Sequence, residues 1–329
     1  MYKIAIIGLG PAGIFTLSLL PTELLSEVIV FEPAAIGGAL ATDYGAVIAN
    51  IPKSVIVDAF EKIPRWAGKP LKHLEKYAPT DCPVLNDVVR QLRELIAPDL
   101  TRIIFHSARV TGYKRTSASA WQLTTSSGLF EAQKLVLCIG ATPKTLDLPK
   151  PIIPLSIALN PAALPNFVIP TDRIVVFGTA HSGTLALRNL RNAGVTALTG
   201  VYKGTTPFLF ARDGFSEGIK QESATIADDL LAHSWATLLP NSDFATTYRA
   251  VYEATAVVYA IGFERPAPVY DDGAGDPKPL FGAQDVYGFG IGFPSTYTGP
   301  DGKLYPDVGF GGFINAIKAA LPSLLTFVP

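Results

Sequence analysis

Cysteine is scarce in this chain of 329 residues, which contains only Cys82 and Cys138. Two distant cysteines cannot form the disulfide framework of a small secreted protein, and they provide neither a CxxC redox pair nor a zinc site. The histidines do not change this conclusion, because His73, His106 and His233 have no cysteine or carboxylate partner at ligand spacing. The sequence therefore predicts no metal site and favours a reducing, cytoplasmic location.

Charge is sparse too, since charged residues make up 17% of the chain against roughly 25% in an average soluble domain. The 27 Lys and Arg are balanced by 28 Asp and Glu, which leaves no basic surplus for a nucleic-acid partner. The most apolar stretches are interrupted, the first by three glycines and Pro11 and the last by Lys318 and Pro322. We therefore expect neither a signal peptide nor a membrane-spanning segment. The length predicts about two domains.

A glycine-rich turn lies between a predicted strand and a predicted helix at the N-terminus. Residues 2–7 (YKIAII) form the strand, GLGPAG follows, and the next strand, 28–31, ends at Glu32, 19 residues after Gly13. This context is the one that a dinucleotide-binding fingerprint requires. The glycines allow a tight turn, a close approach of a pyrophosphate and helix packing, while the acid accepts hydrogen bonds from the ribose. The predicted contacts are Gly8, Gly10, Pro11, Ala12, Gly13 and Glu32.

A second strand, turn and helix begins at residue 173, with GTAHSG in the turn. Ala180 replaces the middle glycine, and the following strand ends at Lys203 rather than at an acid. A lysine there, with Arg212 near it, would favour the 2′-phosphate of NADPH, although NADH and a site without function remain alternatives. His181 is interpreted as a cofactor contact rather than a catalytic acid or base. The predicted contacts are Gly178, His181, Ser182, Gly183 and Lys203.

The order of GLGPAG, FEPAAIGG, LVLCIGATP, GTAHSG and VVYAIGF resembles flavoproteins with two dinucleotide-binding domains. This group contains thioredoxin reductases, ferredoxin–NADP reductases and flavin-containing monooxygenases. The resemblance implies FAD in the first site and an α/β fold of two Rossmann-like three-layer (ββα) domains, the second inserted in the first. The implied division is an FAD-binding domain of residues 1–147 and 255–329 and an NAD(P)-binding domain of residues 148–254.

The same resemblance assigns further cofactor contacts. It implies that Gly37 and Gly38 pass the FAD pyrophosphate, that Asn50 lies near the flavin and that the backbone of Val110 contacts the adenine. It also implies that the chain leaves the FAD domain near Gly140 and returns at residues 260–263. The usual Gly-Asp near the end of such chains is replaced by YGFGIGFP, whose glycines suggest backbone close to a ligand. This stretch adds Gly290 and Gly292 to the predicted contacts.

These observations favour an FAD-dependent NAD(P)H oxidoreductase that moves a hydride from nicotinamide to flavin N5 and then reduces oxygen or a small organic acceptor. VVYAIGFERP and the HSG turn favour a monooxygenase, and the lack of a cysteine pair excludes a dithiol–disulfide enzyme. The alternatives are a ferredoxin- or quinone-type reductase, a flavin-binding protein without nicotinamide turnover, and a dehydrogenase without flavin. We expect no essential side-chain nucleophile and a small-molecule partner, and leave a homodimer open.

Overall fold

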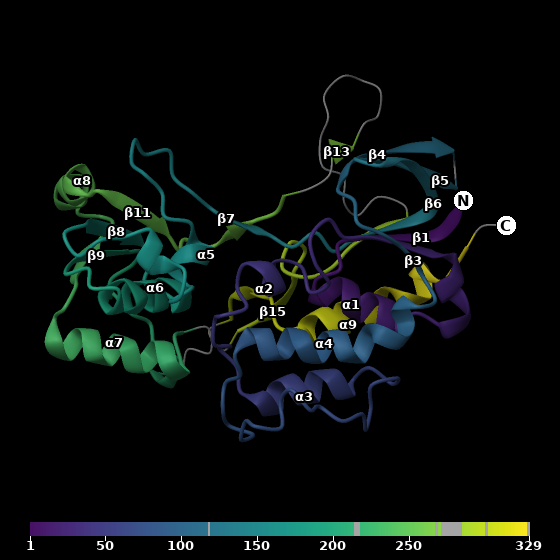
Figure 1. Cartoon of the computed structure of the whole chain (residues 1–329), viewed down its shortest axis with the longest axis horizontal. Helices are drawn as coiled ribbons and strands as arrows, with labels where there is room; N and C mark the ends of the chain where they lie inside the picture. Colours follow the sequence, from purple (N-terminus) through teal and green to yellow (C-terminus); the bar gives the residue numbers. More distant parts are fainter. Residues whose placement is uncertain (118, 214–217, 267–268, 271–284, 300–301, 328–329) are drawn as a thin grey trace.

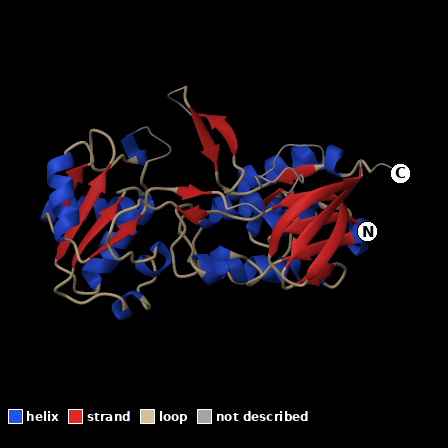
Figure 2. Cartoon of the chain, turned by 90° about the horizontal axis from the view of Figure 1, so that it is seen from above, coloured by secondary structure: helices blue, strands red, loops and turns tan. Residues whose placement is uncertain are grey.

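Two larger β-sheets organise the chain, and they lie at opposite ends of the molecule (Figures 1 and 2). The structure is a computed structural model that describes residues 1–117, 119–213, 218–266, 269–270, 285–299 and 302–327. The first sheet contains β1 (Tyr2–Ile7), β2 (Val28–Phe31), β3 (Ile104–His106), β4 (Val110–Ser117), β5 (Ala120–Thr125), β6 (Gly128–Leu137), β13 (Val269–Tyr270) and β14 (Val286–Gly288).

The first sheet combines a parallel part with an antiparallel meander, because β6 is long enough to belong to both. Its first half pairs with β5, and its second half pairs with β14 on the same edge. The strand order β14-β6-β1-β2-β3 is parallel throughout, whereas β4, β5 and the first half of β6 run antiparallel. The carboxyl ends of the parallel strands therefore meet at one edge, where α/β proteins bind nucleotides.

Alternating side chains of β1 fill two separate cores. Ile4 and Ile6 are fully buried against helices on one face, while Ala5 and Ile7 pack on the other face with Trp121 of β5. Successive residues of a strand point to opposite faces, so one strand supports both layers. The helices of this domain are α1 (Pro11–Leu19), α2 (Ala39–Thr42), α3 (Lys53–Glu61), α4 (Leu85–Leu100) and α9 (Phe310–Leu324), with a 3-10 turn at Thr22–Glu27. The predicted three-layer arrangement is confirmed.

The inserted domain has a four-stranded parallel sheet of order β10-β9-β8-β11. Ile174 and Val176 pack against α6 and α7, whereas Val175 and Val257 pack on the opposite face against α8. The elements are β8 (Arg173–Phe177), β9 (Ala197–Tyr202), β10 (Thr237–Pro240), β11 (Ala256–Tyr259), α5 (Leu155–Ala158), α6 (His181–Asn192), α7 (Gln221–His233) and α8 (Phe244–Glu253), with 3-10 turns at Leu164–Asn166 and Ala211–Asp213.

Two short strands carry the chain between the domains. β7 (Thr142–Pro143) leaves the first domain and pairs antiparallel with β12 (Phe263–Glu264), where the chain returns. The sequence division places residues 255–329 in the first domain, but β11 pairs with β8 and keeps the chain in the inserted sheet as far as Tyr259. The cause is the fully buried pair of valines in β11, which completes the inserted core. The rest of the division stays a prediction.

A hairpin of β15 (Ser295–Thr298) and β16 (Leu304–Asp307) separates β14 from α9. The two strands pair antiparallel, and the rings of Tyr297 and Tyr305 lie beside each other with their centroids 6.0 Å apart. Among the helices in the described part of the chain, none has the length and apolar character needed to cross a bilayer.

Candidate functional site

The first glycine-rich turn packs tightly between the end of β6 and the start of α1. Gly8 has a φ of +96°, and a Cβ there would lie 2.3 Å from the carbonyl oxygen of Cys138. A Cβ on Gly13 would lie 2.1 Å from the carbonyl oxygen of Gly8. Real side chains do not make contacts this short, so both glycines are required by packing.

Gly10 differs from Gly8 and Gly13, because the space beside it is open. The nearest described atom to a Cβ at this position is the carbonyl oxygen of Gly37, 3.8 Å away. Gly10 also precedes the first turn of α1, which begins at Pro11, and none of the described side chains caps this end. The first N–H groups of a helix have no intrahelical acceptor and attract anions. The turn therefore fits the pyrophosphate of a dinucleotide.

Glu32 is buried, with 6% of its surface exposed, and its carboxylate fixes the turn. Oε2 accepts a hydrogen bond from the Leu9 N–H at 2.8 Å, and Oε1 accepts one from the Ala34 N–H at 3.0 Å. Each carboxylate oxygen can accept a second hydrogen bond. The structure thus adds a positioning role, and the hydrogen bonds from ribose hydroxyls to Glu32 stay a prediction.

Gly37 and Gly38 lie directly against the first turn. The Gly37 N–H donates to the Leu9 carbonyl at 2.8 Å, and a Cβ on Gly38 would lie 3.1 Å from the Cα of Gly10. Both residues have positive φ angles, +104° and +56°, which glycine adopts readily. The sequence separates this pair from the turn by more than twenty residues, and the fold brings them together.

The loop after β14 closes the same region. A Cβ on Gly290 would lie 2.7 Å from the Cβ of Ala12, and a Cβ on Gly292 would lie 2.4 Å from the carbonyl oxygen of Gly140. The residues predicted here from two ends of the chain therefore meet at the start of α1. Val110 lies in β4 and is buried in the same core cluster as Phe31, the last residue of β2.

The two cysteines are free thiols in different surroundings. Cys138 lies behind the first turn, and complete burial raises the pKa of its thiol to about 12, although a contact with the Thr16 hydroxyl opposes the shift. Cys82 is partly exposed, and burial together with nearby Asp81 raises the pKa of its thiol. Both thiols are protonated near neutral pH, which makes each a poor nucleophile.

The second turn reproduces the geometry of the first. Gly178 has a φ of +93°, and a Cβ there would lie 2.3 Å from the carbonyl oxygen of Ala260. A Cβ on Gly183 would lie 1.9 Å from the carbonyl oxygen of Gly178. Ala180, which replaces the middle glycine, has an extended backbone, so its methyl group causes no backbone strain.

A cavity of about 490 Å³ lies beside the second turn. The structure brings together four predicted residues that line it, namely Asn50, Gly178, His181 and Lys203. Lys220 also lines the cavity, although the sequence did not predict this role. It belongs to no motif, because it immediately precedes α7 and is distant in the sequence from the second turn. Ser182 and Gly183 belong to the first turn of α6 and are not among the described lining residues.

Arg212 does not support Lys203 as the sequence suggested. Its guanidinium forms two hydrogen bonds of 2.7 Å with Asp228 and lies 3.9 Å from the centroid of the Phe210 ring. It is absent from the described residues that line the cavity. Lys203 and Lys220 are therefore the two cations of this site, and none of its described lining residues is acidic.

His181 connects the two domains at the start of α6. Its Nδ1 lies 3.0 Å from the Ser223 hydroxyl, and the ring also forms a hydrogen bond with the backbone of Ile48 in the first domain. Burial lowers the pKa of the imidazole, although Glu222 opposes the shift. The ring is therefore neutral near pH 7, which suits a packing contact better than proton transfer.

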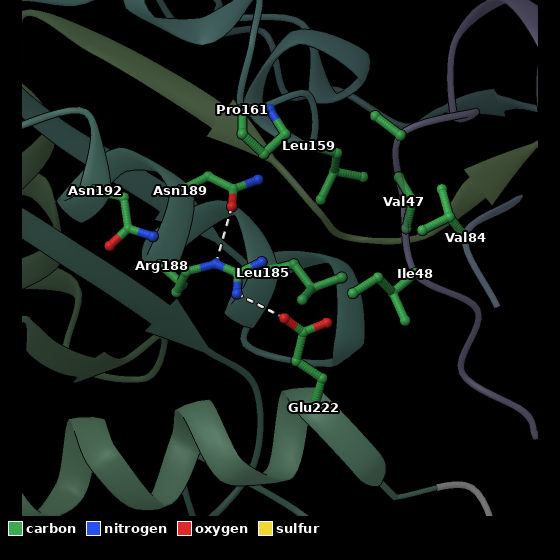
Figure 3. A pocket seen from close by; sticks show the side chains of 11 residues that line it. Val47, Ile48, Val84, Leu159, Pro161, Leu185, Arg188, Asn189, Asn192 and Glu222 are labelled. Atoms are coloured by element: carbon green, nitrogen blue, oxygen red, sulfur yellow. Dashed lines mark hydrogen bonds and ion pairs between the residues drawn. The ribbon is translucent and has the colours of Figure 1, made fainter. Parts of the chain in front are cut away.

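A neighbouring cavity of about 360 Å³ separates α6 from the segment that contains Val47 and Ile48 (Figure 3). Arg188 donates to Glu222 Oε1 at 2.6 Å and to Asn189 Oδ1 at 3.0 Å. Oε2 of Glu222 is buried and has no hydrogen-bond partner among the described residues. Apolar side chains and this polar pair together give the cavity an amphipathic lining.

Two histidines have carboxylate partners that the sequence interpretation overlooked. His233 Nδ1 lies 2.9 Å from Asp229, four residues earlier on α7, and His73 Nε2 lies 3.4 Å from Glu94. Neither pair gains a third ligand, since the described residues contain no group of three His, Cys, Asp or Glu that could hold a metal ion.

Residues 5–142 match the family model of FAD-NAD(P)-binding proteins, so this part of the chain carries an FAD-NAD(P)-binding domain. The chain is also similar to the monooxygenase AgnR1 of Paecilomyces divaricatus, with 29% identity over 241 residues. That match covers 59% of this chain and 60% of AgnR1, so this chain matches less than two thirds of the length of AgnR1.

Solved structures with the same fold include both monooxygenases and a disulfide reductase. The cadaverine monooxygenase DfoA of Erwinia amylovora, bound to FAD, has a TM-score of 0.66 at 13% identity, over 99% of this chain and 94% of that one. A flavin monooxygenase of Stenotrophomonas maltophilia has a TM-score of 0.62 at 15% identity, over 98% and 97%. The bacillithiol disulfide reductase of Staphylococcus aureus also has a TM-score of 0.62, at 16% identity over 98% of both chains. The chain thus has the fold of flavoproteins with two dinucleotide-binding domains, as the resemblance implied.

Proposed function

We propose that the chain is an FAD-dependent monooxygenase that is reduced by NADPH and acts on a small organic molecule. The observation that carries the proposal is the repeated geometry of the two turns, each of which follows a parallel strand and opens a helix. Gly8 and Gly13 in one turn and Gly178 and Gly183 in the other have no room for a side chain. Two equivalent turns on one chain support two dinucleotides, one donating hydride and one accepting it.

The first turn is assigned to FAD. Its residues would hold the cofactor through the N–H groups at the start of α1, with Glu32 directed to the ribose and Gly290 and Gly292 giving backbone close to the flavin side. When bound, the flavin accepts a hydride at N5 and passes the electrons to the final acceptor. The protein contributes position, charge and control of water access, and no described side chain is needed as a nucleophile.

The second turn is assigned to NADPH. Lys203 and Lys220 line its cavity, so a 2′-phosphate would meet two cations there. The neutral imidazole of His181 would pack against the nucleotide without adding charge. Asn50 reaches the same cavity from the first domain, which supports a nicotinamide position between the two domains.

Oxygen is the favoured electron acceptor. The similarity to AgnR1 supports a monooxygenase, although it extends over only part of that protein. A disulfide substrate would require a reactive cysteine pair, whereas Cys138 is buried with a raised pKa and Cys82 has no second thiol beside it. A ferredoxin- or quinone-type reductase is the second candidate, because the same fold and both turns would serve it equally.

Rapid mixing of the FAD-loaded protein with NADPH under anaerobic conditions tests the proposal. We expect the visible flavin band to bleach, and to bleach faster with NADPH than with NADH. Oxygen uptake that is coupled to formation of an oxygenated product supports the monooxygenase, and reduction of a quinone without product oxygenation supports the reductase. A flavin band that persists with both nucleotides would overturn the assignment of the second turn.

A further inference from the structure

Three aromatic side chains form an exposed line along α8. Phe244, Tyr248 and Tyr252 are 80%, 72% and 73% exposed, and their spacing of four residues places them on one face of the helix. We call these three residues the aromatic stripe. Helix α8 packs on the inserted sheet through Val251 and lies at the end of the molecule far from the first sheet (Figure 1).

The size of the aromatic stripe distinguishes it from ordinary surface apolar residues, which occur singly. Typical areas of aromatic side chains, multiplied by these exposed fractions, give roughly 450 Å² of aromatic surface in contact with water. The largest apolar patch of a monomeric protein is about 300–600 Å² and is often functional. The stripe reaches this range with three residues of one helix, which indicates a surface that is covered by a partner.

The two ends of the aromatic stripe carry opposite charges. At the N-terminal end, Asp243 accepts a hydrogen bond from the Thr246 N–H at 3.1 Å, and hydrogen bonds with the side chain and the backbone of Thr246 lower the pKa of the carboxyl. At the C-terminal end, Lys150 Nζ donates to the carbonyl oxygens of Tyr252 and Ala254 at 2.6 and 2.8 Å. At the same end, Glu253 and Arg173 form an ion pair of 2.5 Å, and Asp172 accepts a hydrogen bond from the Thr255 hydroxyl at 2.9 Å.

We propose that the aromatic stripe is a two-fold interface with a second copy of this chain, in which the two α8 helices lie antiparallel. Tyr248 then packs against Tyr248 of the partner subunit, and Phe244 packs against the partner subunit's Tyr252. The same arrangement brings Asp243 to the end where the partner's Lys150 lies. If all of their exposed ring surface is covered, two stripes together bury roughly 900 Å², which is about half to three quarters of the roughly 1,200–2,000 Å² of a stable interface.

A lipid surface fits the same stripe less well. Helices that bind anionic membranes carry an excess of Lys and Arg beside their apolar face. Helix α8 and its N-cap carry Arg249 against Asp243 and Glu253, so the acidic residues outnumber the basic one. The proposal does not depend on the proposed function, because none of the residues assigned to the cofactors lies on α8.

The residue on the two-fold axis gives a sharp test, because it meets its own copy. We expect the FAD-loaded wild-type protein to be dimeric by analytical ultracentrifugation, and Tyr248→Glu and Tyr248→Lys each to raise the dimer Kd by more than about tenfold through like-charge repulsion. An equimolar mixture of the two variants restores the dimer. Both substitutions are on an exposed helix face, and circular dichroism and thermal melting check that the fold is unchanged.

Phe167→Ser is the matched control, because Phe167 is an exposed aromatic residue of the same domain outside the stripe, and we expect it to leave the dimer intact. A monomeric wild-type protein, a dimer that survives both Tyr248 variants, or a mixture that stays monomeric would each overturn the proposal. Co-sedimentation of the wild-type protein with anionic vesicles, lost in both variants, would assign the stripe to a membrane surface instead.

Discussion

Replacement of Gly10 by valine separates the cofactor role of the first turn from its structural role. Gly10 has an extended backbone (φ −70°, ψ −174°), which valine adopts without strain, and a Cβ there meets only the Gly37 carbonyl at 3.8 Å. We therefore expect Gly10→Val to change the free energy of unfolding of the apoprotein by less than about 0.5 kcal/mol. The branched side chain does fill the open space that a pyrophosphate needs.

The expected loss of FAD affinity follows from the hydrogen bonds that valine would displace. Each bond from a helix N–H to a phosphate oxygen contributes about 1.5–3 kcal/mol, because the acceptor is charged. Loss of one such bond raises the Kd for FAD by about 10- to 100-fold, and loss of two raises it further. Fluorescence titration of the apoprotein with FAD measures the change.

Gly13→Ala is the control with the opposite pattern. Its Cβ would lie 2.1 Å from the Gly8 carbonyl oxygen, so the turn must move, and we expect a loss of stability of about 1–3 kcal/mol. The reasoning is refuted if Gly10→Val binds FAD as the wild type does, or if it lowers the melting temperature as much as Gly13→Ala does.

Three further predictions concern other parts of the molecule. Lys203→Ala and Lys220→Ala should each raise the Kd for NADPH by about tenfold and leave that for NADH unchanged in anaerobic reduction titrations; equal losses for both nucleotides would contradict the 2′-phosphate assignment. His181 has a lowered pKa in the folded state, so its contribution to stability is present above its ordinary value of 6.5 and is lost as the pH falls through the folded value. Melting temperatures from pH 7 to 5 should therefore fall less steeply for His181→Gln, and an identical slope would count against this explanation. Lys134→Met removes a buried ammonium that lies 3.3 Å from the carboxylate of Asp285, and should lower the free energy of unfolding by about 3 kcal/mol in denaturant titrations. Lys3→Met removes an exposed ion pair and should lower it by less than about 1 kcal/mol.

The parts of the site that follow from local geometry could be predicted from the sequence. Gly8 and Gly13 are identifiable because a strand, a tight turn and a helix leave no room for side chains within a few residues. The contacts of Gly37 with the turn required a resemblance to known proteins, since they depend on how the chain returns. Lys220 carries no local signal at all, because only the folding of α7 beside the second turn brings it to the cavity.

Two features that were not predicted are nevertheless indicated by the spacing of their residues in the sequence. Asp229 and His233 are four residues apart, a spacing that makes them neighbours on a helix. Phe244, Tyr248 and Tyr252 have the same spacing, which would have indicated a helix with an aromatic face. The domain boundary at 255 was harder to place, since a buried apolar strand such as β11 fits either sheet until its pairing is known.

Each glycine-rich turn packs against a backbone carbonyl from a later part of the chain, and this has a consequence for the order of folding. The first turn is completed by Cys138, from the far end of β6, and the second by Ala260, which follows β11. Neither turn is complete when only its own strand and helix have been synthesised, because the opposing backbone is added much later. We therefore expect cofactor uptake to follow the synthesis of these later strands, and a fragment that ends before β6 to lack the backbone against which Gly8 packs.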